Sequence, residues 1–179
     1  MEKNFGFVIG RFQPFHNGHK HMIDKALEQC KLLTVFIGSA QESRTERNPL
    51  TFLERYWVIS EVYEEEIKNG RLVILPLIDA GIGDNPKWGD YVLNLFKSLY
   101  GRYPDVYFSG SESVREKWFN LDVDLEIVSF PRSEVDISGT QVREEILKEN
   151  YSNIPIPIYG IIIKEKIEES RGENKWKKY

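Results

Sequence analysis

Cysteine is almost absent from this chain, since Cys30 is the only one among 179 residues. A single cysteine excludes an intrachain disulfide and a metal cluster held by thiolates. This usage fits a reducing compartment, and we therefore expect a cytoplasmic protein.

Long hydrophobic runs are missing as well. The sequence contains no stretch of about 18 apolar residues, so we expect no segment that spans a membrane. The first ten residues, MEKNFGFVIG, lack the charged start, apolar centre and cleavage site of a signal peptide. Internal repeats and low-complexity segments are also absent.

Positive charge is not in excess, because 28 acidic residues outnumber 24 lysines and arginines and leave a formal net charge of −4. Such a chain has no electrostatic footprint for nucleic acid or for a membrane surface, and we expect neither as a partner. Any site for an anion must therefore come from a local cluster of positive side chains.

The hydrophobic content of 41% and the length suit one domain over residues 1–179, with a core in 5–150 and a C-terminal helical extension in 151–179. Five short apolar runs alternate with helical patterns, which predicts a doubly wound, Rossmann-like α/β fold with a parallel sheet covered on both faces. Ligands bind such sheets at the carboxyl ends of the strands, where the strand order reverses. The expected strands are 5–9, 32–37, 72–75, 106–108 and 125–128, and the expected helices are 19–30, 51–68, 88–100, 113–120, 138–149 and 161–169.

The first cluster of interest is the stretch GRFQPFHNGH, from Gly10 to His19, which follows the first expected strand. An Asn-Gly turn precedes a helix, whose N-terminal N–H groups and dipole attract anions. His16 and His19 are three residues apart, share one face there, and can both donate hydrogen bonds to phosphate oxygens. Arg11 adds a permanent positive charge at the strand end.

Other interpretations of this stretch remain open. His16 could cap the helix while His19 is a satisfied surface residue. Zinc is a further alternative, although it usually takes three or four protein ligands, and only His21 and distant carboxylates remain to complete the set.

A second cluster, ISGTQVR, lies at 137–143, before another expected helix. Its small hydroxyl residues and its glycine expose backbone donors at a helix N-terminus, and Arg143 follows Thr140 by three residues on the first turn. The same residues form a capping box, with Ser138 as the cap and Gln141 reaching back. Together the two clusters suggest one polyphosphate held between two helix N-termini.

These stretches resemble the HxGH nucleotidyltransferase superfamily. GRFQPFHNGH is similar to its HxGH motif, and ISGTQVR to its second motif, ISSTxxR. The fuller pattern, GRFQPFHxGH with SGTxxR about 120 residues later, resembles the archaeal-type nicotinamide-mononucleotide adenylyltransferases. Further matches run over roughly residues 5–145: IGSAQ at 37–41, NPLTF at 48–52, Glu54 with Arg55, Asp79, Asn85 with Trp88, and FSG at 108–110.

The resemblance implies transfer of the adenylyl group of ATP to nicotinamide mononucleotide (NMN), giving NAD and pyrophosphate by direct in-line attack. His16, His19, Arg11 and Arg143 would be the catalytic residues. Mg²⁺ would bridge ATP oxygens mainly through water, with no protein metal ligands. The ATP site would comprise Gly10, Arg11, Phe12, His16, Gly18, His19, Ser109, Gly110, Ser138, Thr140 and Arg143.

The resemblance also implies a site for NMN formed by Arg11, Arg55, Asp79, Asn85 and Trp88. Trp88 would stack on the positively charged nicotinamide ring. A core position is the alternative for Trp88, and Asn85 with the proline after it also suits a helix N-cap.

This chain departs from the family pattern at three places. Ser111 stands where an asparagine is common, the loop at 79–85 is about two residues longer than usual, and Arg132 has no assigned role. Family members are commonly homo-oligomers, and the apolar residues at 154–158 and 161–163 suit either an interface or a core.

Rival functions lie close to this one. A pantetheine-phosphate adenylyltransferase or a cytidylyltransferase shares the superfamily, but typically has a different approach to HxGH. A regulator that senses NAD or ATP without turnover would not need His16, His19 and Arg143 together.

Overall fold

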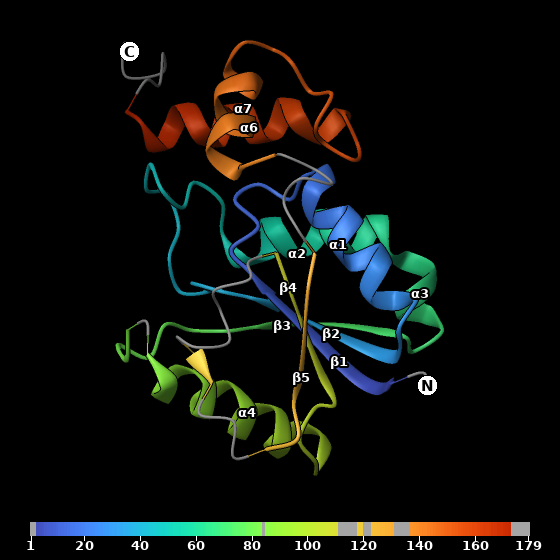
Figure 1. Ribbon diagram of the computed structural model, residues 1–179. Helices are drawn as coiled ribbons and strands as arrows, with labels where there is room; N and C mark the ends of the chain where they lie inside the picture. The colour runs from blue at the N-terminus through green and yellow to red at the C-terminus, as the bar shows by residue number, and fades with distance from the viewer. Residues whose placement is uncertain (1–2, 84, 111–117, 120–122, 131–136, 173–179) are drawn as a thin grey trace.

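A parallel sheet of five strands lies at the centre of the computed structural model, which describes residues 3–83, 85–110, 118–119, 123–130 and 137–172 (Figure 1). The strand order is β3-β2-β1-β4-β5, and every neighbouring pair is parallel. The prediction of a doubly wound α/β fold is confirmed. The strands are β1 (Lys3–Gly10), β2 (Cys30–Ile37), β3 (Leu72–Pro76), β4 (Val106–Ser109) and β5 (Glu126–Ser129).

The strand order reverses beside β1. From β1 the chain moves outward through β2 to β3, and β4 then returns to the other side of β1. A doubly wound sheet leaves a crevice at this point, outside the carboxyl ends of the two diverging strands. Arg11 follows β1 and Gly110 follows β4, so the expected site residues meet at this crevice.

Helices cover both faces of the sheet (Figure 1). The helices α1 (Asn17–Leu27), α2 (Phe52–Val62) and α3 (Glu64–Lys68) lie on one face, and α4 (Pro86–Tyr100) lies on the other. Successive side chains of a strand point to opposite faces, so Phe7 joins the cluster under α4 whereas Val8 joins the cluster under α1. Burial on both sides explains why the strands are almost continuously apolar.

Two further helices lie together beyond the carboxyl edge of the sheet, α6 (Gly139–Leu147) and α7 (Ile158–Ser170) (Figure 1). They enclose a small core of their own, which includes Leu50, Val142 and Ile163. Ile158, Ile161 and Ile162 are exposed. The apolar C-terminal stretch is therefore divided between core and surface.

Several helix boundaries differ from the expected ones. The helix expected over 51–68 is interrupted at Tyr63, whose backbone leaves the helical region (φ −118°, ψ 32°). The buried Tyr63 hydroxyl donates to Asp24 Oδ1 at 2.9 Å, and this tertiary contact accompanies the break. The helix expected over 113–120 falls largely outside the described residues. No helix in the described ranges is both long enough and apolar enough to cross a membrane.

Candidate functional site

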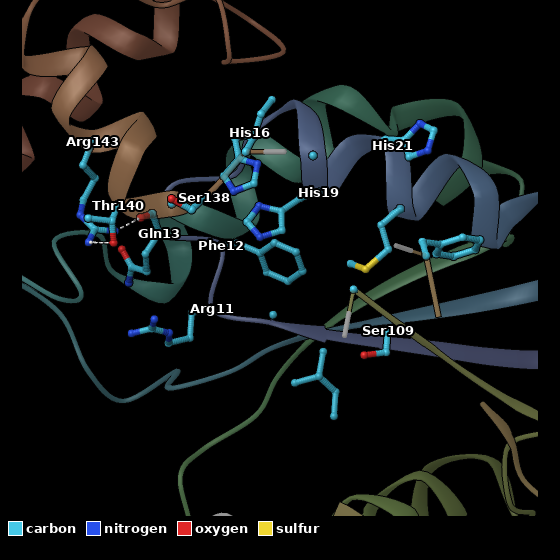
Figure 2. A pocket seen from close by; sticks show the side chains of 18 of the residues that line it. Arg11, Phe12, Gln13, His16, His19, His21, Ser109, Ser138, Thr140 and Arg143 are labelled. Atoms are coloured by element: carbon cyan, nitrogen blue, oxygen red, sulfur yellow. Dashed lines mark hydrogen bonds between the residues drawn. The ribbon is translucent and has the colours of Figure 1, made fainter. Parts of the chain in front are cut away.

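A pocket of about 480 Å³ opens at the carboxyl ends of β1 and β4 (Figure 2). The N-termini of α1 and α6 both border it. The structure brings together every residue that was expected around ATP, and all eleven line this one pocket: Gly10, Arg11, Phe12, His16, Gly18, His19, Ser109, Gly110, Ser138, Thr140 and Arg143.

A second pocket, of about 890 Å³, adjoins the first. The two pockets share Ile9, Gly10, Arg11 and Trp118 in their linings. Arg11 therefore stands where a ligand in one pocket would meet a ligand in the other. Asp79 and Trp88, which were expected at the acceptor, line the second pocket.

Three polar residues of the second pocket, Glu42, Arg47 and Asn48, were not among the site residues expected from the sequence. The Nδ2 of Asn48 donates to Glu42 Oε2, and its Oδ1 is buried without a partner. All three lie in the polar loop between β2 and α2. Such a loop has no periodicity that reveals which side chains turn inward, and only Asn48 belonged to a matched motif.

The two histidines of the first cluster stack on each other. The ring centroids of His16 and His19 are 3.7 Å apart with planes at 22°, and Figure 2 shows both rings near Phe12. His16 occupies the N-cap position of α1, but its side chain makes no capping hydrogen bond. The Nδ1 atoms of both rings are buried without a partner. The alternative of a capping His16 and a satisfied surface His19 is therefore wrong.

Burial favours the neutral form of both imidazoles. Desolvation lowers the pKa of His16 from 6.5 to about 4. The pKa of His19 lies well below its usual range because of burial and because His16 is beside it. A neutral imidazole still carries one N–H donor, and an anion bound next to it would raise its pKa. The pair can thus donate hydrogen bonds and also take up a proton as negative charge accumulates.

Hydrogen bonds to residues in the C-terminal part of the chain hold the start of α1 in place. The backbone N–H of Asn17 donates to the Asn153 carbonyl at 2.9 Å, and its side chain donates to the Ser152 carbonyl at 3.0 Å. These bonds anchor the first turn, and with it the positions of both stacked histidines.

The start of α6 has a side-chain cap. The hydroxyl of Ser138 accepts a hydrogen bond from the backbone N–H of Gln141 at 3.2 Å. The Gln141 side chain donates to Glu145 at 2.9 Å. The predicted capping box is therefore half correct: Ser138 caps the helix, but Gln141 pairs with the residue one turn ahead, where its amide meets a carboxylate.

Arg143 links the two clusters. Its Nη1 donates to the Gln13 carbonyl at 2.7 Å, and its Nη2 donates to Thr140 Oγ1 at 3.2 Å (Figure 2). The expectation that Thr140 and Arg143 share one side of the first helical turn is confirmed. Gln13 in turn exchanges two side-chain hydrogen bonds with the backbone of Leu50, at 2.8 and 2.9 Å.

The charge of the first pocket is positive. Among the described residues, its lining holds two guanidinium groups, on Arg11 and Arg143, and three imidazoles, but no carboxylate. Burial lowers the pKa of Arg143, and the nearby Arg11 lowers it further. In a chain of net charge −4 this local excess of positive charge would favour a bound anion.

Metal binding by side chains alone is not favoured. Within the described ranges, no group of three or more His, Cys, Asp or Glu residues is arranged to hold a metal ion. The zinc alternative for the histidine cluster therefore lacks the ligands it requires.

Two residues expected at the acceptor do not line either pocket, and both assignments need correction. Arg55 is 0% exposed, and its guanidinium faces backbone carbonyls. Asn85 is the N-cap of α4: its Oδ1 accepts from the Lys87 N–H at 2.9 Å and its Nδ2 donates to the Ile82 carbonyl at 2.6 Å. Its side chain is thus already engaged by its own loop.

Trp88 combines the two roles that were considered for it. It lies in the first turn of α4, packs against the cluster under that helix, and also lines the second pocket. Asp79 exchanges two hydrogen bonds of 3.1 Å with the Gln41 side chain, which holds the loop after β3 against the loop after β2. Ser111 and Arg132, two of the departures from the family pattern, lie outside the described residues.

Known proteins resemble this chain over most of its length. Residues 7–145 match a family model described as cytidylyltransferase-like. The chain is 34% identical over 160 residues to the nicotinamide-nucleotide adenylyltransferase of Thermoplasma volcanium, covering 87% of this chain and 84% of that protein. It is 35% identical over 149 residues to the protein of the same name from Thermococcus kodakarensis, covering 80% and 72% respectively.

Solved structures share the fold. A bifunctional NMN adenylyltransferase/ADP ribose pyrophosphatase from Francisella tularensis, complexed with AMP and an Mn ion, matches with a TM-score of 0.67 at 22% identity. The match covers 95% of this chain and 51% of that one, so this chain spans about half its length. A nicotinic acid mononucleotide adenylyltransferase from Plasmodium falciparum matches with a TM-score of 0.60 at 16% identity, over 93% and 98% of the two chains.

Proposed function

Since this chain belongs to the cytidylyltransferase-like family and, within it, to the nicotinamide-nucleotide adenylyltransferases, we propose that it transfers the adenylyl group of ATP to NMN and releases pyrophosphate. The single observation that supports this best is the pair of adjoining pockets with Arg11 in both linings. A reaction between two phosphate-bearing substrates needs two sites that meet at their phosphates. A cation at the junction lowers the repulsion between them.

The first pocket suits the triphosphate of ATP. The proposed arrangement holds the β- and γ-phosphates by Ser138, Thr140 and Arg143 at the start of α6, and places the α-phosphate near the stacked histidines of α1. Helix N-termini and a forked guanidinium are both well suited to phosphate oxygens. Bond formation and cleavage then occur at the phosphorus between the two pockets.

The chemistry needs no protein nucleophile. The 5′-phosphate oxygen of NMN attacks the α-phosphorus of ATP in line, the bond to the β-phosphate oxygen breaks, and pyrophosphate leaves with that electron pair. Catalysis then consists of positioning and of neutralising charge on the leaving group. His19, which burial keeps neutral, donates its imidazole N–H as a hydrogen bond to the negative charge that develops on the phosphate oxygens.

Mg²⁺ is proposed to enter with ATP as part of the substrate. The lining of the first pocket offers nitrogen donors and no carboxylate in the described residues, so ATP oxygens and water would supply the ligands. This arrangement fits the coordination preference of Mg²⁺, which usually retains several water ligands.

The second pocket suits the pyridine nucleotide. Trp88 offers an indole face for the positively charged ring, and Asp79 lies in the same lining. Arg47 and Arg11 would face the 5′-phosphate near the junction of the pockets.

A homo-oligomer is also proposed. Leu53 and Trp57 on α2 are 71% and 59% exposed, and Ile158 on α7 is 63% exposed. The rings of Trp57 and Tyr159 lie 6.3 Å apart, so α2 and α7 contribute to one apolar surface. Analytical ultracentrifugation tests this: a larger assembly for the natural chain and a smaller one for Trp57→Glu are expected, and a monomer for the natural chain would contradict it.

The proposed activity is tested by mixing the protein with ATP, Mg²⁺ and one acceptor at a time, and measuring pyrophosphate together with the nucleotide product by mass spectrometry. NMN is expected to give NAD and pyrophosphate in equal amounts. Turnover with phosphopantetheine or with CTP and a phosphorylated alcohol, but not with ATP and NMN, would favour a rival transferase. Binding of ATP without any turnover would favour a sensor.

A further inference from the structure

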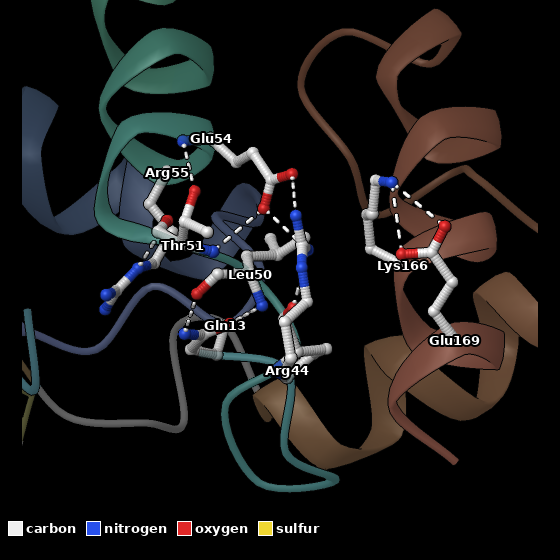
Figure 3. Close-up of polar contacts among 9 residues, drawn as sticks. Gln13, Arg44, Leu50, Thr51, Glu54, Arg55, Lys166 and Glu169 are labelled. Atoms are coloured by element: carbon white, nitrogen blue, oxygen red, sulfur yellow. Dashed lines mark hydrogen bonds and ion pairs between the residues drawn. The ribbon is translucent and has the colours of Figure 1, made fainter. Parts of the chain in front are cut away.

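Arg55 is a buried cation that lines neither pocket. It is 0% exposed and leaves α2 on the same side as Val58 and Ile59, which are also buried. Figure 3 shows its side chain turning back beneath Thr51. A charge in such a position is costly unless its surroundings solvate it.

Backbone carbonyls solvate this guanidinium. Its Nη1 donates to the carbonyls of Arg11 at 2.8 Å and Gly38 at 2.7 Å. Its Nη2 donates to the Ser39 carbonyl at 3.1 Å, and its Nε to the Thr51 carbonyl at 3.1 Å. Four of the five N–H donors of one guanidinium therefore bind the chain just after β1, the end of β2 and the start of α2.

The backbone next to Arg11 needs this support. Phe12 adopts φ +51°, a backbone conformation that residues other than glycine rarely take. The turn therefore persists only where the surrounding structure fixes it. The Phe12 ring lies 4.8 Å from the His19 ring between centroids. The same turn therefore bears Arg11, whose side chain lines both pockets, and Phe12, whose ring lies against His19.

We propose that Arg55 is a positioning residue, which holds the carbonyl of residue 11 against the end of β2 and thereby aims the Arg11 guanidinium at the junction of the two pockets. This rests on the proposed adenylyl transfer, in which Arg11 meets both phosphates. Lysine cannot replace it, because one ammonium group does not reach four carbonyls arranged around a planar fork.

The test is a double-mutant cycle of Arg11→Lys, Arg55→Lys and the two together, in the complete chain. Arg55→Lys alone is expected to lower kcat by about 10- to 100-fold, the scale of loss that a displaced catalytic group produces. In the Arg11→Lys background the same substitution is expected to change kcat by less than about threefold, because residues that act as a unit are not additive. Equal losses in both backgrounds, or an unchanged kcat in Arg55→Lys, would overturn the proposal.

A matched control comes from the other end of the sheet. Arg71 also donates to backbone carbonyls, those of Leu27 and Cys30, far from both pockets. Arg71→Lys is expected to lower the melting temperature but to leave kcat within about twofold of the natural chain. A fall in kcat as large as that of Arg55→Lys would show that loss of any such arginine acts through general stability, and would overturn the proposal. If Arg55→Lys does not fold, the cycle is run with Arg55→Gln, which keeps an N–H₂ donor.

Calorimetric titration with inorganic tripolyphosphate gives a readout that needs no acceptor. Arg55→Lys is expected to weaken tripolyphosphate binding by about tenfold in the natural background and by less than about threefold beside Arg11→Lys. If this coupling appears while the natural chain makes no NAD, the proposed function fails and the positioning role stands. If NAD forms but no coupling appears in either readout, the positioning role alone fails.

Discussion

His16 and His19 stack with their ring centroids 3.7 Å apart, and neither buried Nδ1 has a hydrogen-bond partner. Buried polar atoms in native proteins are nearly always paired, so these two ring nitrogens are available to a bound ligand or to water. Two cations cannot share so small a buried space without an anion. Both imidazoles are therefore neutral without a ligand, and a bound phosphate would favour their protonated forms.

The buried His16 predicts a loss of stability in acid. Its pKa is about 4 in the folded chain and about 6.5 when unfolded, so between these values the unfolded state binds more protons. The stability that the neutral His16 contributes is therefore fully present above pH 6.5, and it is lost as the pH falls toward 4. Between pH 7 and pH 4.5 the free energy of unfolding should decrease by roughly 2–3 kcal/mol through this group.

Urea unfolding of the natural chain and of His16→Asn at both pH values measures this contribution. The variant should lose less stability on acidification, by about the amount stated above. An identical acid loss in both proteins would show that His16 is not held neutral in the folded state.

His19→Ala is expected to lower kcat far more than it weakens ATP binding, because the charge that His19 meets develops in the transition state. A loss on the order of 10²- to 10³-fold matches removal of one preorganised donor. Steady-state kinetics with a separate measurement of ATP affinity checks it. A kcat close to that of the natural chain would remove His19 from the mechanism.

Arg143→Lys keeps the charge but loses the fork that now joins Thr140 and Gln13. Because a lysine cannot bind phosphate in a bidentate manner, we expect KM for ATP to rise by about tenfold or more. The melting temperature of the variant, measured beside the kinetics, separates this effect from loss of the Gln13 contact. Unchanged KM and kcat would show that Arg143 does not grip the triphosphate.

The first pocket could be predicted from the sequence because most of its expected residues gather in two short stretches. GRFQPFHNGH and ISGTQVR each combine a strand or loop end, a helix start and positive side chains, and parallel strands bring such ends to one edge. Local chemistry and topology placed these two stretches together, and the family resemblance added Ser109 and Gly110.

The second pocket was less predictable, since side-chain direction in loops depends on distant contacts. Asn85 was expected at the ligand, yet its amide is used by its own loop. Arg55 was misplaced although the helical period puts it on the face of Val58 and Ile59, a pattern that indicates burial. The break at Tyr63 accompanies a hydrogen bond from its hydroxyl to Asp24, 39 residues away, and no local pattern shows it.

Crossed titrations of the two ligands test the central claim, that one pocket holds ATP and its neighbour holds NMN. Trp88→Ala should weaken NMN binding by about three- to thirty-fold, since a cationic ring over an indole gains roughly 0.5–2 kcal/mol, and should leave ATP binding unchanged. Arg143→Lys should weaken ATP binding and leave NMN binding unchanged. Isothermal titration of each ligand into each variant, after confirming equal melting temperatures, gives all four values. If Trp88→Ala abolished ATP binding while NMN still bound normally, the assignment of the two pockets would be contradicted.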